Sequence, residues 1–248
     1  MRGFVLQIGD NGHYSNDVAT VEEVIDAHNW FRPNDKIEFV SYHYDDITKE
    51  NTEGLVPVGS VQFVNKVLSF YGKEGMKPIN IPECLKEEKF LARKIAFAKN
   101  RTEIDNIKKE WNTNKVFIKS NTSVKHWMPE LYTGKDCIAE DEEYFVSEEV
   151  DFASEWRCFV YRGQLRGIKH YLGNEWIMPE KEFVENCIQT MTKDSDMLAY
   201  TLDVGVTGDG KNAVIEVHNF LSCGLYGFEE PIITPMLTNA FKYELNHN

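Results

Sequence analysis

The chain has 248 residues, 42% of them hydrophobic and 12% aromatic, which is enough for one large domain or a few lobes sharing a core. Its 27 Lys and Arg residues against 40 Asp and Glu residues give a formal net charge of −13 at pH 7. An acidic surface repels phosphate backbones and anionic lipid, so bulk nucleic-acid binding and membrane-surface binding are disfavoured. Any anionic ligand therefore needs a local cluster of cations.

The sequence carries no pattern typical of export or membrane insertion. The apolar run Phe4–Ile8 is short and is broken by Gly9 and Asp10, which indicates a buried strand rather than a signal peptide. No apolar stretch approaches the roughly 18–20 residues of a membrane span. The five cysteines are odd in number and form no CxxC pair, which is typical of reduced thiols. We predict a cytoplasmic protein.

Strands and helices alternate in the first part of the chain. The hydrophobic periodicity predicts, in chain order, a strand at Gly3–Ile8, a helix capped by Asp17, a strand at Ile37–Tyr42 and a helix from Ser60 to Gly72. Residues 1–80 are therefore predicted to form a small N-terminal α/β lobe, which ends in a linker with two prolines, Lys77–Pro82.

Strands dominate the remainder of the chain, after two helical segments predicted at Glu83–Ala98 and Thr102–Trp111. The predicted strands are Val116–Lys119, Tyr144–Val150, Trp156–Tyr161, Gln164–Tyr171, Tyr200–Val206 and Ala213–Val217. Two more helices are predicted at Pro179–Thr192 and Ile233–Glu244. The predicted fold class is α+β, with mostly antiparallel hairpins backed by helices behind the α/β lobe.

The last predicted hairpin places two carboxylates opposite one another. A turn centred between Asp209 and Gly210 puts Asp203 directly across from Glu216. Two carboxylates with Cβ atoms about 5 Å apart repel each other, so a cation between them is one interpretation and a solvated sheet face is the other. Mg²⁺ takes oxygen ligands and bridges phosphates, which fits such a pair.

Side-chain alternation assigns the residues of this hairpin to two faces. The face of the carboxylates is predicted to hold Thr201, Asp203, Gly205, Val214, Glu216 and His218. The buried face is predicted to hold Leu202, Val204, Val206, Ile215 and Val217.

Cations precede this hairpin at several points. Lys119 ends a predicted strand and Lys125 follows in a polar loop. One interpretation is that these lysines bind phosphate, and the alternative is a lysine at a strand end whose ammonium group reaches solvent. Arg157 lies between aromatic residues on one strand face, where it either pairs with a buried acid or binds a ligand phosphate. Arg93 lies in a predicted helix, where an exposed helical cation is the alternative to a binding role.

In order and spacing, these segments resemble the ATP-grasp ligases. The resemblance is carried by Phe117–Lys119, Val146–Val150, Glu155–Arg157, Leu202-Asp203 and Ile215–Asn219. Val58–Phe63 and Glu216–Tyr226 are similar to an uncharacterised clade allied to the ribosomal-protein glutamate ligase and seen often in phages and bacteria. The resemblance covers about residues 90–225, and residues 1–80 match the smaller lobe that precedes the ATP-grasp domain.

The resemblance implies two β-rich lobes, residues 81–150 and residues 151–248, that clamp ATP. The implied activity is ADP-producing carboxylate–amine or carboxylate–thiol ligation through an acyl phosphate, with ATP and a small acid, amine or peptide as substrates. The implied ATP-binding residues are Arg93, Lys119, Lys125, Glu148, Glu149, Val150 and Glu155; the implied catalytic residues are Arg157 and Lys169; and the implied Mg²⁺ (or Mn²⁺) ligands are Asp203, Glu216, His218 and Asn219. If a phage encodes the chain, the expected location is the cytoplasm of the host. The acid, the amine and the oligomeric state stay open.

The sequence departs from the family at the second metal strand, where the family has Glu-x-Asn. Position 218 is His, and the asparagine follows at Asn219. We expect a β-bulge that brings Asn219 to the metal; the alternatives are that His218 binds substrate or phosphate, or that the metal site is weakened. Imidazole is a poorer ligand for Mg²⁺ than for Mn²⁺ or Zn²⁺. A nucleotide-binding or protein-interaction module that does not ligate, for example in a phage, and a small-molecule kinase are the alternative functions.

Overall fold

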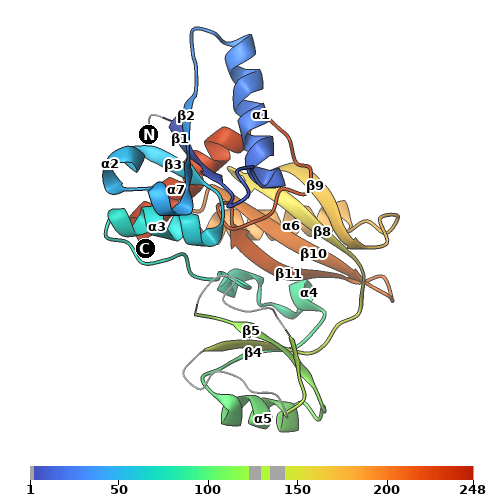
Figure 1. Cartoon of the computed structure of the whole chain (residues 1–248). Coiled ribbons are helices and arrows are strands. Elements are labelled where there is room, and N and C mark those ends of the chain that lie inside the picture. The colour runs from blue at the N-terminus through green and yellow to red at the C-terminus, as the bar shows by residue number, and fades with distance from the viewer. Residues whose placement is uncertain (1–2, 123–129, 135–142, 248) are drawn as a thin grey trace.

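The computed structural model describes residues 3–122, 130–134 and 143–247 of the chain. In this part of the chain the strands form three sheets. Figure 1 shows the sheet that contains β4 and β5 at one end of the molecule, with α5 on its outer side, and both chain termini beside the N-terminal sheet. None of the helices described combines the length and the apolar run that a membrane crossing requires.

The N-terminal sheet is parallel and has the strand order β2-β1-β3. Its strands are β1 (Gly3–Ile8), β2 (Glu38–His43) and β3 (Leu55–Val58). Its helices are α1 (Asn16–Phe31), the short α2 (Lys49–Thr52) and α3 (Val61–Phe70), with a 3-10 turn at Tyr44–Asp46.

Serine side chains start the two long helices of this lobe. The hydroxyl of Ser60 accepts a hydrogen bond from the amide of Phe63, as the predicted helix start requires. The cap of α1 is Ser15 and not the predicted Asp17, which lies in the first turn of that helix. The strand β3 was not predicted, because its four residues include a proline and show no alternation.

The second sheet is antiparallel, with the order β4-β7-β5-β6. Its strands are β4 (Ile95–Ala98), β5 (Val116–Ser120), β6 (Glu130–Tyr132) and β7 (Tyr144–Ser147), and α5 (Arg101–Glu110) packs on it. Ile104 of α5 and residues of all four strands form one buried cluster.

The predicted helix at Glu83–Ala98 is wrong. The segment forms a 3-10 turn at Glu83–Leu85, the short helix α4 (Glu88–Leu91) and then β4. Ala92 ends α4 in the left-handed region, with φ of +49°. The next residues pair with β7, and this pairing between distant segments overrides local helix propensity.

The third sheet is antiparallel, with the order β11-β10-β8-β9. Its strands are β8 (Phe152–Tyr161), β9 (Gln164–Gly173), β10 (Ala199–Thr207) and β11 (Asn212–Asn219). Helix α6 (Lys181–Asp194) buries its apolar side in a cluster with one face of this sheet. Helix α7 (Ile233–His247) contacts β10, β3 and α1, and so joins the third sheet to the N-terminal lobe.

The register of the last hairpin is partly as predicted. Asp203 lies opposite Glu216, as the turn predicts, but a bulge follows between Asp203 and Val204. Val204 therefore pairs with Val214, and both belong to the buried cluster under α6. The prediction that Val214 shares the face of the carboxylates is wrong, because Ile215 is the extra residue of the bulge.

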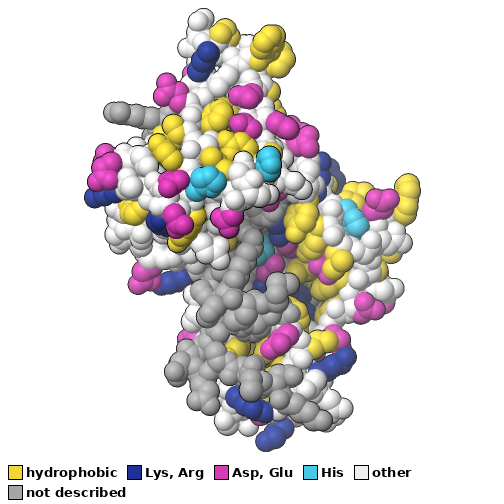
Figure 2. Space-filling model, viewed as in Figure 1, with side chains coloured by type: hydrophobic (Ala, Val, Ile, Leu, Met, Phe, Trp, Pro, Cys, Tyr) yellow, Lys and Arg dark blue, Asp and Glu magenta, His cyan; other side chains and the backbone are white. Residues whose placement is uncertain are grey.

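Acidic side chains are spread over the part of the surface that the N-terminal sheet and its helices form in the view of Figure 2.

Replacing Gly173 with alanine is expected to lower the free energy of unfolding by about 1–3 kcal/mol. Gly173 has φ of +81°, and an added Cβ would lie 2.4 Å from the carbonyl oxygen of Ala153. Urea denaturation of the two proteins measures the difference. Gly208→Ala is the control, because a Cβ at Gly208 meets nothing within 4 Å, and equal losses in both variants would contradict the prediction.

Candidate functional site

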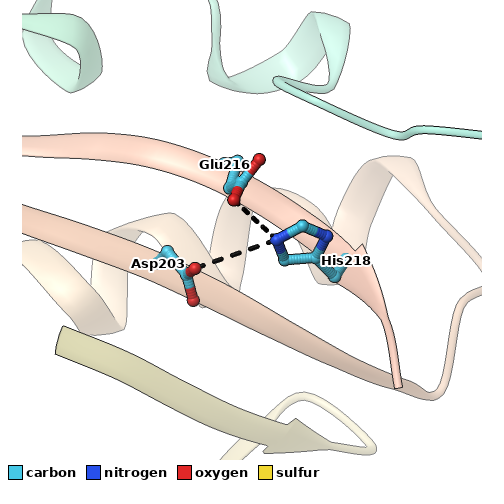
Figure 3. A group of neighbouring side chains, drawn as sticks. All are labelled: Asp203, Glu216 and His218. Atoms are coloured by element: carbon cyan, nitrogen blue, oxygen red, sulfur yellow. Dashed lines mark ion pairs between the residues drawn. The ribbon is translucent and has the colours of Figure 1, made fainter. Parts of the chain in front are cut away.

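Two carboxylates and one imidazole converge on adjacent strands of the third sheet. The Nε2 atom of His218 lies 2.7 Å from Oε1 of Glu216 and 3.8 Å from Oδ2 of Asp203 (Figure 3). One ligand atom from each of the three residues lies within 4.8 Å of the others. Asp203 comes from β10, and Glu216 and His218 come from β11, two residues apart on one face.

This donor set fits a divalent cation. Two ligands bound side by side at about 2.0–2.2 Å from one ion lie about 3 Å apart. The 2.7 Å between His218 and Glu216 is close to this spacing, and the 3.8 Å between His218 and Asp203 is longer. The carboxylate oxygens suit Mg²⁺, whereas the imidazole shifts the preference toward Mn²⁺. Asp203, Glu216 and His218 are therefore the residues that would hold a metal ion.

Asn219 lies away from this group. Its Nδ2 donates to Oε1 of Glu244 at 2.6 Å, and its Oδ1 accepts from the amide of Leu221 at 2.8 Å. His218 pairs with Thr201 and Asn219 pairs with Tyr200, so the register between Glu216 and Asn219 is regular. The predicted bulge that would turn Asn219 toward the metal is wrong, because the bulge in this hairpin lies on the other side of Glu216.

Arg157 holds Asp203 with two hydrogen bonds. On β8, directly opposite Asp203, its Nε donates to Oδ1 at 2.8 Å and its Nη2 donates to Oδ2 at 2.7 Å. Both residues are buried, Arg157 with 6% and Asp203 with 1% exposure. Burial alone would lower the pKa of the Arg157 guanidinium, but Asp203 raises it above its ordinary value. Of the two interpretations of Arg157, the structure shows the pairing with a buried acid.

The pairing with Arg157 does not use all the acceptor sites of Asp203. An ionised carboxylate offers about four lone-pair sites, and Arg157 takes two of them. Asp203 can therefore bind an ion while Arg157 fixes the orientation of the Asp203 carboxylate. The two parallel hydrogen bonds between Arg157 and Asp203 are of the strong, charge-assisted kind.

Lys119 reaches the same group from the second sheet. It lies on β5, and its ammonium forms an ion pair with Oε2 of Glu216. Burial raises the pKa of the Glu216 carboxyl, but His218 and Lys119 together lower it well below its ordinary value of 4.5. The pair links the two antiparallel sheets at the point where the acids of the third sheet converge.

Arg93 lies beside the bulge of β11. It follows α4 instead of lying within a helix, and it donates to the carbonyl oxygens of Val214 at 2.8 Å and Ile215 at 3.1 Å. Burial lowers the pKa of Arg93 to about 10. The prediction of a helical position is wrong, and the guanidinium holds the strand segment next to Glu216.

Two further predicted residues lie on the face of Arg157. Lys169 of β9 lies directly opposite Arg157, and Glu155 lies two residues before it on β8. Burial, more than the nearby Asp203 and Glu216, raises the pKa of Glu155.

Three of the implied ATP-binding residues, Glu148, Glu149 and Val150, lie in the segment that connects β7 to β8. The amide of Glu148 donates to the carbonyl oxygen of Lys94 at 3.0 Å, and the amide of Lys94 donates to Oε2 of Glu148 at 2.9 Å. Glu149 forms an ion pair with Lys115, and Val150 follows it. Lys125 lies outside the described residues, so its predicted role stays a prediction.

Two tyrosines that the sequence did not indicate stack on each other beside the guanidinium of Arg157. The ring centroids of Tyr171 and Tyr226 lie 5.7 Å and 5.1 Å from its Cζ. A register shift between Glu155 and Trp156 makes Tyr171 the extra residue of β9, and nothing in the local sequence marks that shift. Tyr226 stands at φ of +48° in the loop after β11.

The free energy of unfolding is expected to fall more steeply in the wild-type protein than in Glu216→Gln between about pH 5 and about pH 3. The pKa of Glu216 is lowered in the folded state, so the ionised carboxylate contributes to the free energy of unfolding. This contribution is complete above the ordinary pKa of 4.5 and is lost as the pH falls through the pKa of the folded state. Urea denaturation across this range measures both profiles. Parallel pH profiles of the two proteins would contradict the lowered pKa of Glu216 in the folded state.

The family model described as ATP-grasp domain, R2K clade family 2, matches residues 90–234, which is more than half of the chain. No curated protein matches the chain in sequence.

Solved structures match over nearly the whole chain. The RimK domain protein ATP-grasp from Sphaerobacter thermophilus DSM 20745 is 14% identical with a TM-score of 0.57, covering 96% of this chain and 99% of that one. D-alanyl-alanine synthetase A from Vibrio cholerae O1 biovar eltor is 11% identical with a TM-score of 0.58, covering 100% of each chain. The ATP-grasp ligase PsnB, complexed with a phosphomimetic variant of its minimal precursor, Mg and ADP, is 12% identical with a TM-score of 0.55, covering 98% of each chain. At these identities the likeness concerns the fold.

Proposed function

We propose that the chain, which belongs to the ATP-grasp domain family R2K clade family 2, is an ATP-dependent carboxylate–amine ligase. One observation carries the proposal: Lys119 of one antiparallel sheet forms an ion pair with Glu216 of the other, and Glu216 lies in one group with Asp203 and His218. A cation and a metal-binding group that face each other from two sheets suit a nucleotide triphosphate, because phosphates take both kinds of partner.

The proposed roles follow from where the residues lie. Lys119, with Lys125, would bind phosphate oxygens, and the backbone at Glu148–Val150 would bind the adenine edge. Asp203, Glu216 and His218 would hold Mg²⁺ or Mn²⁺, which when bound would neutralise charge on the β- and γ-phosphates.

Four further residues would complete the phosphate site without touching the metal. Arg157 fixes the orientation of Asp203, and Lys169 next to it would stabilise charge on the transferred phosphoryl group. Arg93 and Glu155 would support this arrangement, Arg93 by holding the bulge of β11.

The proposed reaction has two balanced steps. A carboxylate oxygen of the acid substrate attacks the γ-phosphorus, the bond from that phosphorus to the β–γ bridging oxygen breaks, and ADP leaves with the electron pair. The nitrogen of the amine then attacks the acyl carbon, inorganic phosphate leaves, and the nitrogen loses one proton. The residues of the chain position the reactants and stabilise charge, and no covalent intermediate on the protein forms.

An isotope experiment tests this proposal. The purified protein is incubated with MgATP and mixtures of amino acids and peptides whose carboxylates carry ¹⁸O, and ADP, phosphate and products are analysed by mass spectrometry. The ligase predicts inorganic phosphate that contains one ¹⁸O atom, formed only when acid and amine are both present. A stable phosphorylated product would instead identify a kinase, and nucleotide binding without ADP formation would identify a module that does not ligate; either result would overturn the proposal.

A further inference from the structure

We propose that a cavity between the N-terminal sheet and the loop Phe220–Leu225 binds the amine substrate, and that this substrate is a primary amine on an apolar body. The inference rests on the proposed function, to which it adds the place and the chemical class of the second substrate.

The cavity has a volume of about 360 Å³, within the range of about 300–1,000 Å³ that is common for small-ligand sites. It lies at the carboxyl ends of β1 and β3, where Gln7 and Val58 line it. In the strand order β2-β1-β3, β2 lies on one side of β1 and β3 lies on the other, so the strand order reverses at β1. Open α/β sheets bind ligands at the carboxyl ends of their strands where the order reverses, and the cavity lies at this position.

The lining is largely apolar and carries one ionisable carboxylate. Val18, Val21, Val61 and Leu225 form much of the wall, and Asp17 contributes the carboxylate. Among the residues described as lining the cavity, none is Lys, Arg or His. A negative charge without a cation favours an ammonium group and disfavours a carboxylate, and the apolar wall favours a hydrophobic body.

Asp17 retains the capacity to bind an ammonium. Its Oδ1 accepts a hydrogen bond from the amide of Leu225 at 3.0 Å, which uses one of the acceptor sites of the carboxylate. An ammonium group donates up to three hydrogen bonds, and a charge-assisted bond to a carboxylate is among the stronger ones.

One loop joins the cavity to the strand that carries two of the proposed metal ligands. The loop Phe220–Leu225 continues directly from β11, which carries Glu216 and His218. Arg157 donates to the carbonyl oxygen of Gly224 at 3.1 Å, and the next residue of the loop is the one that donates to Asp17. The group that orients Asp203 and the carboxylate of the cavity therefore hold two consecutive residues of one loop. An ammonium has no lone pair on its nitrogen, so the bound substrate must give one proton to the carboxylate of Asp17 before the free amine attacks the acyl phosphate.

Binding of 2-phenylethylamine and of 3-phenylpropionate tests the proposal, with isothermal titration calorimetry on the full chain in the presence of MgADP. The wild-type protein is expected to bind the amine more tightly than the acid. Asp17→Asn is expected to weaken amine binding by about tenfold or more, because it removes the charge and retains an oxygen that can accept from Leu225. Asp26→Asn, at an exposed position on the same helix, is the control and is expected to leave binding unchanged.

The outcomes separate this inference from the proposed function. If MgADP binds all three proteins alike but the acid binds as tightly as the amine, or Asp17→Asn binds the amine as tightly as the wild type, the amine site is refuted while the nucleotide site stands. If the wild-type protein fails to bind MgADP at all, the proposed function itself fails.

Discussion

Arg157→Ala is expected to lower the free energy of unfolding by about 3–5 kcal/mol, because it leaves a buried charge without its partner. Asp203 is 1% exposed, and both of its oxygens accept hydrogen bonds from Arg157. The guanidinium also lies against the rings of Tyr171 and Tyr226, which stack on each other beside it, so its removal opens space in a packed layer. Urea denaturation at pH 7 measures the loss.

The matched control is Arg166→Ala, since Arg166 is exposed on the neighbouring strand β9. Its loss is expected to lie within about 0.5 kcal/mol of zero. Arg157→Lys keeps the charge but cannot form the forked pair with Asp203, and it is expected to fall between the two. If Arg157→Ala and Arg166→Ala lose equal stability, the ion pair does not hold the third sheet together.

Glu216→Gln is expected to reduce the rate of ADP release by about 10²–10³-fold, the loss typical for one preorganised charged or polar group in an active site. Glu216 is where Lys119 of the second sheet and His218 of the third both form ion pairs, so the substitution removes the charge that they share. The amide keeps the volume of the side chain, which separates the effect of charge from that of packing. A coupled ADP assay with acid and amine substrates supplied measures the rate.

Asp209→Asn serves as the control on the same hairpin, because Asp209 lies in the exposed turn and pairs with Lys211 there. It is expected to turn over ATP like the wild type. Equal rates for Glu216→Gln and Asp209→Asn would remove Glu216 from the proposed phosphate site.

The ATP-grasp fold and the α+β class that the sequence predicted are confirmed. The position of Asp203 opposite Glu216 could be predicted because the turn between β10 and β11 sets the register by itself. The bulge one residue later could not, because the carbonyl groups of Val214 and Ile215 bind Arg93, more than a hundred residues away.

The sequence alone did not identify the partner of Arg157, for a similar reason. Strand alternation placed the Arg157 guanidinium on the same strand face as neighbouring aromatic residues, but it did not identify the opposite strand. Asp203 becomes the neighbour of Arg157 only because β8 pairs with β10 in the observed register. Local patterns also misassigned Ile95–Ala98, whose strand conformation depends on pairing with β7. The chemistry-bearing residue types were thus visible in the sequence, whereas their partners depended on pairing between distant segments.

The central claim is that the acids of the third sheet and the lysine of the second bind one metal–nucleotide complex between them. A crystal structure of the chain with Mn²⁺ and a non-hydrolysable ATP analogue tests it, since the anomalous signal of Mn²⁺ locates the ion independently of the nucleotide. We predict an ion bound to Glu216, with Asp203 and His218 as further ligands, and Lys119 on a phosphate oxygen. A nucleotide bound elsewhere, or an ion that contacts neither Glu216 nor Asp203, would contradict the claim.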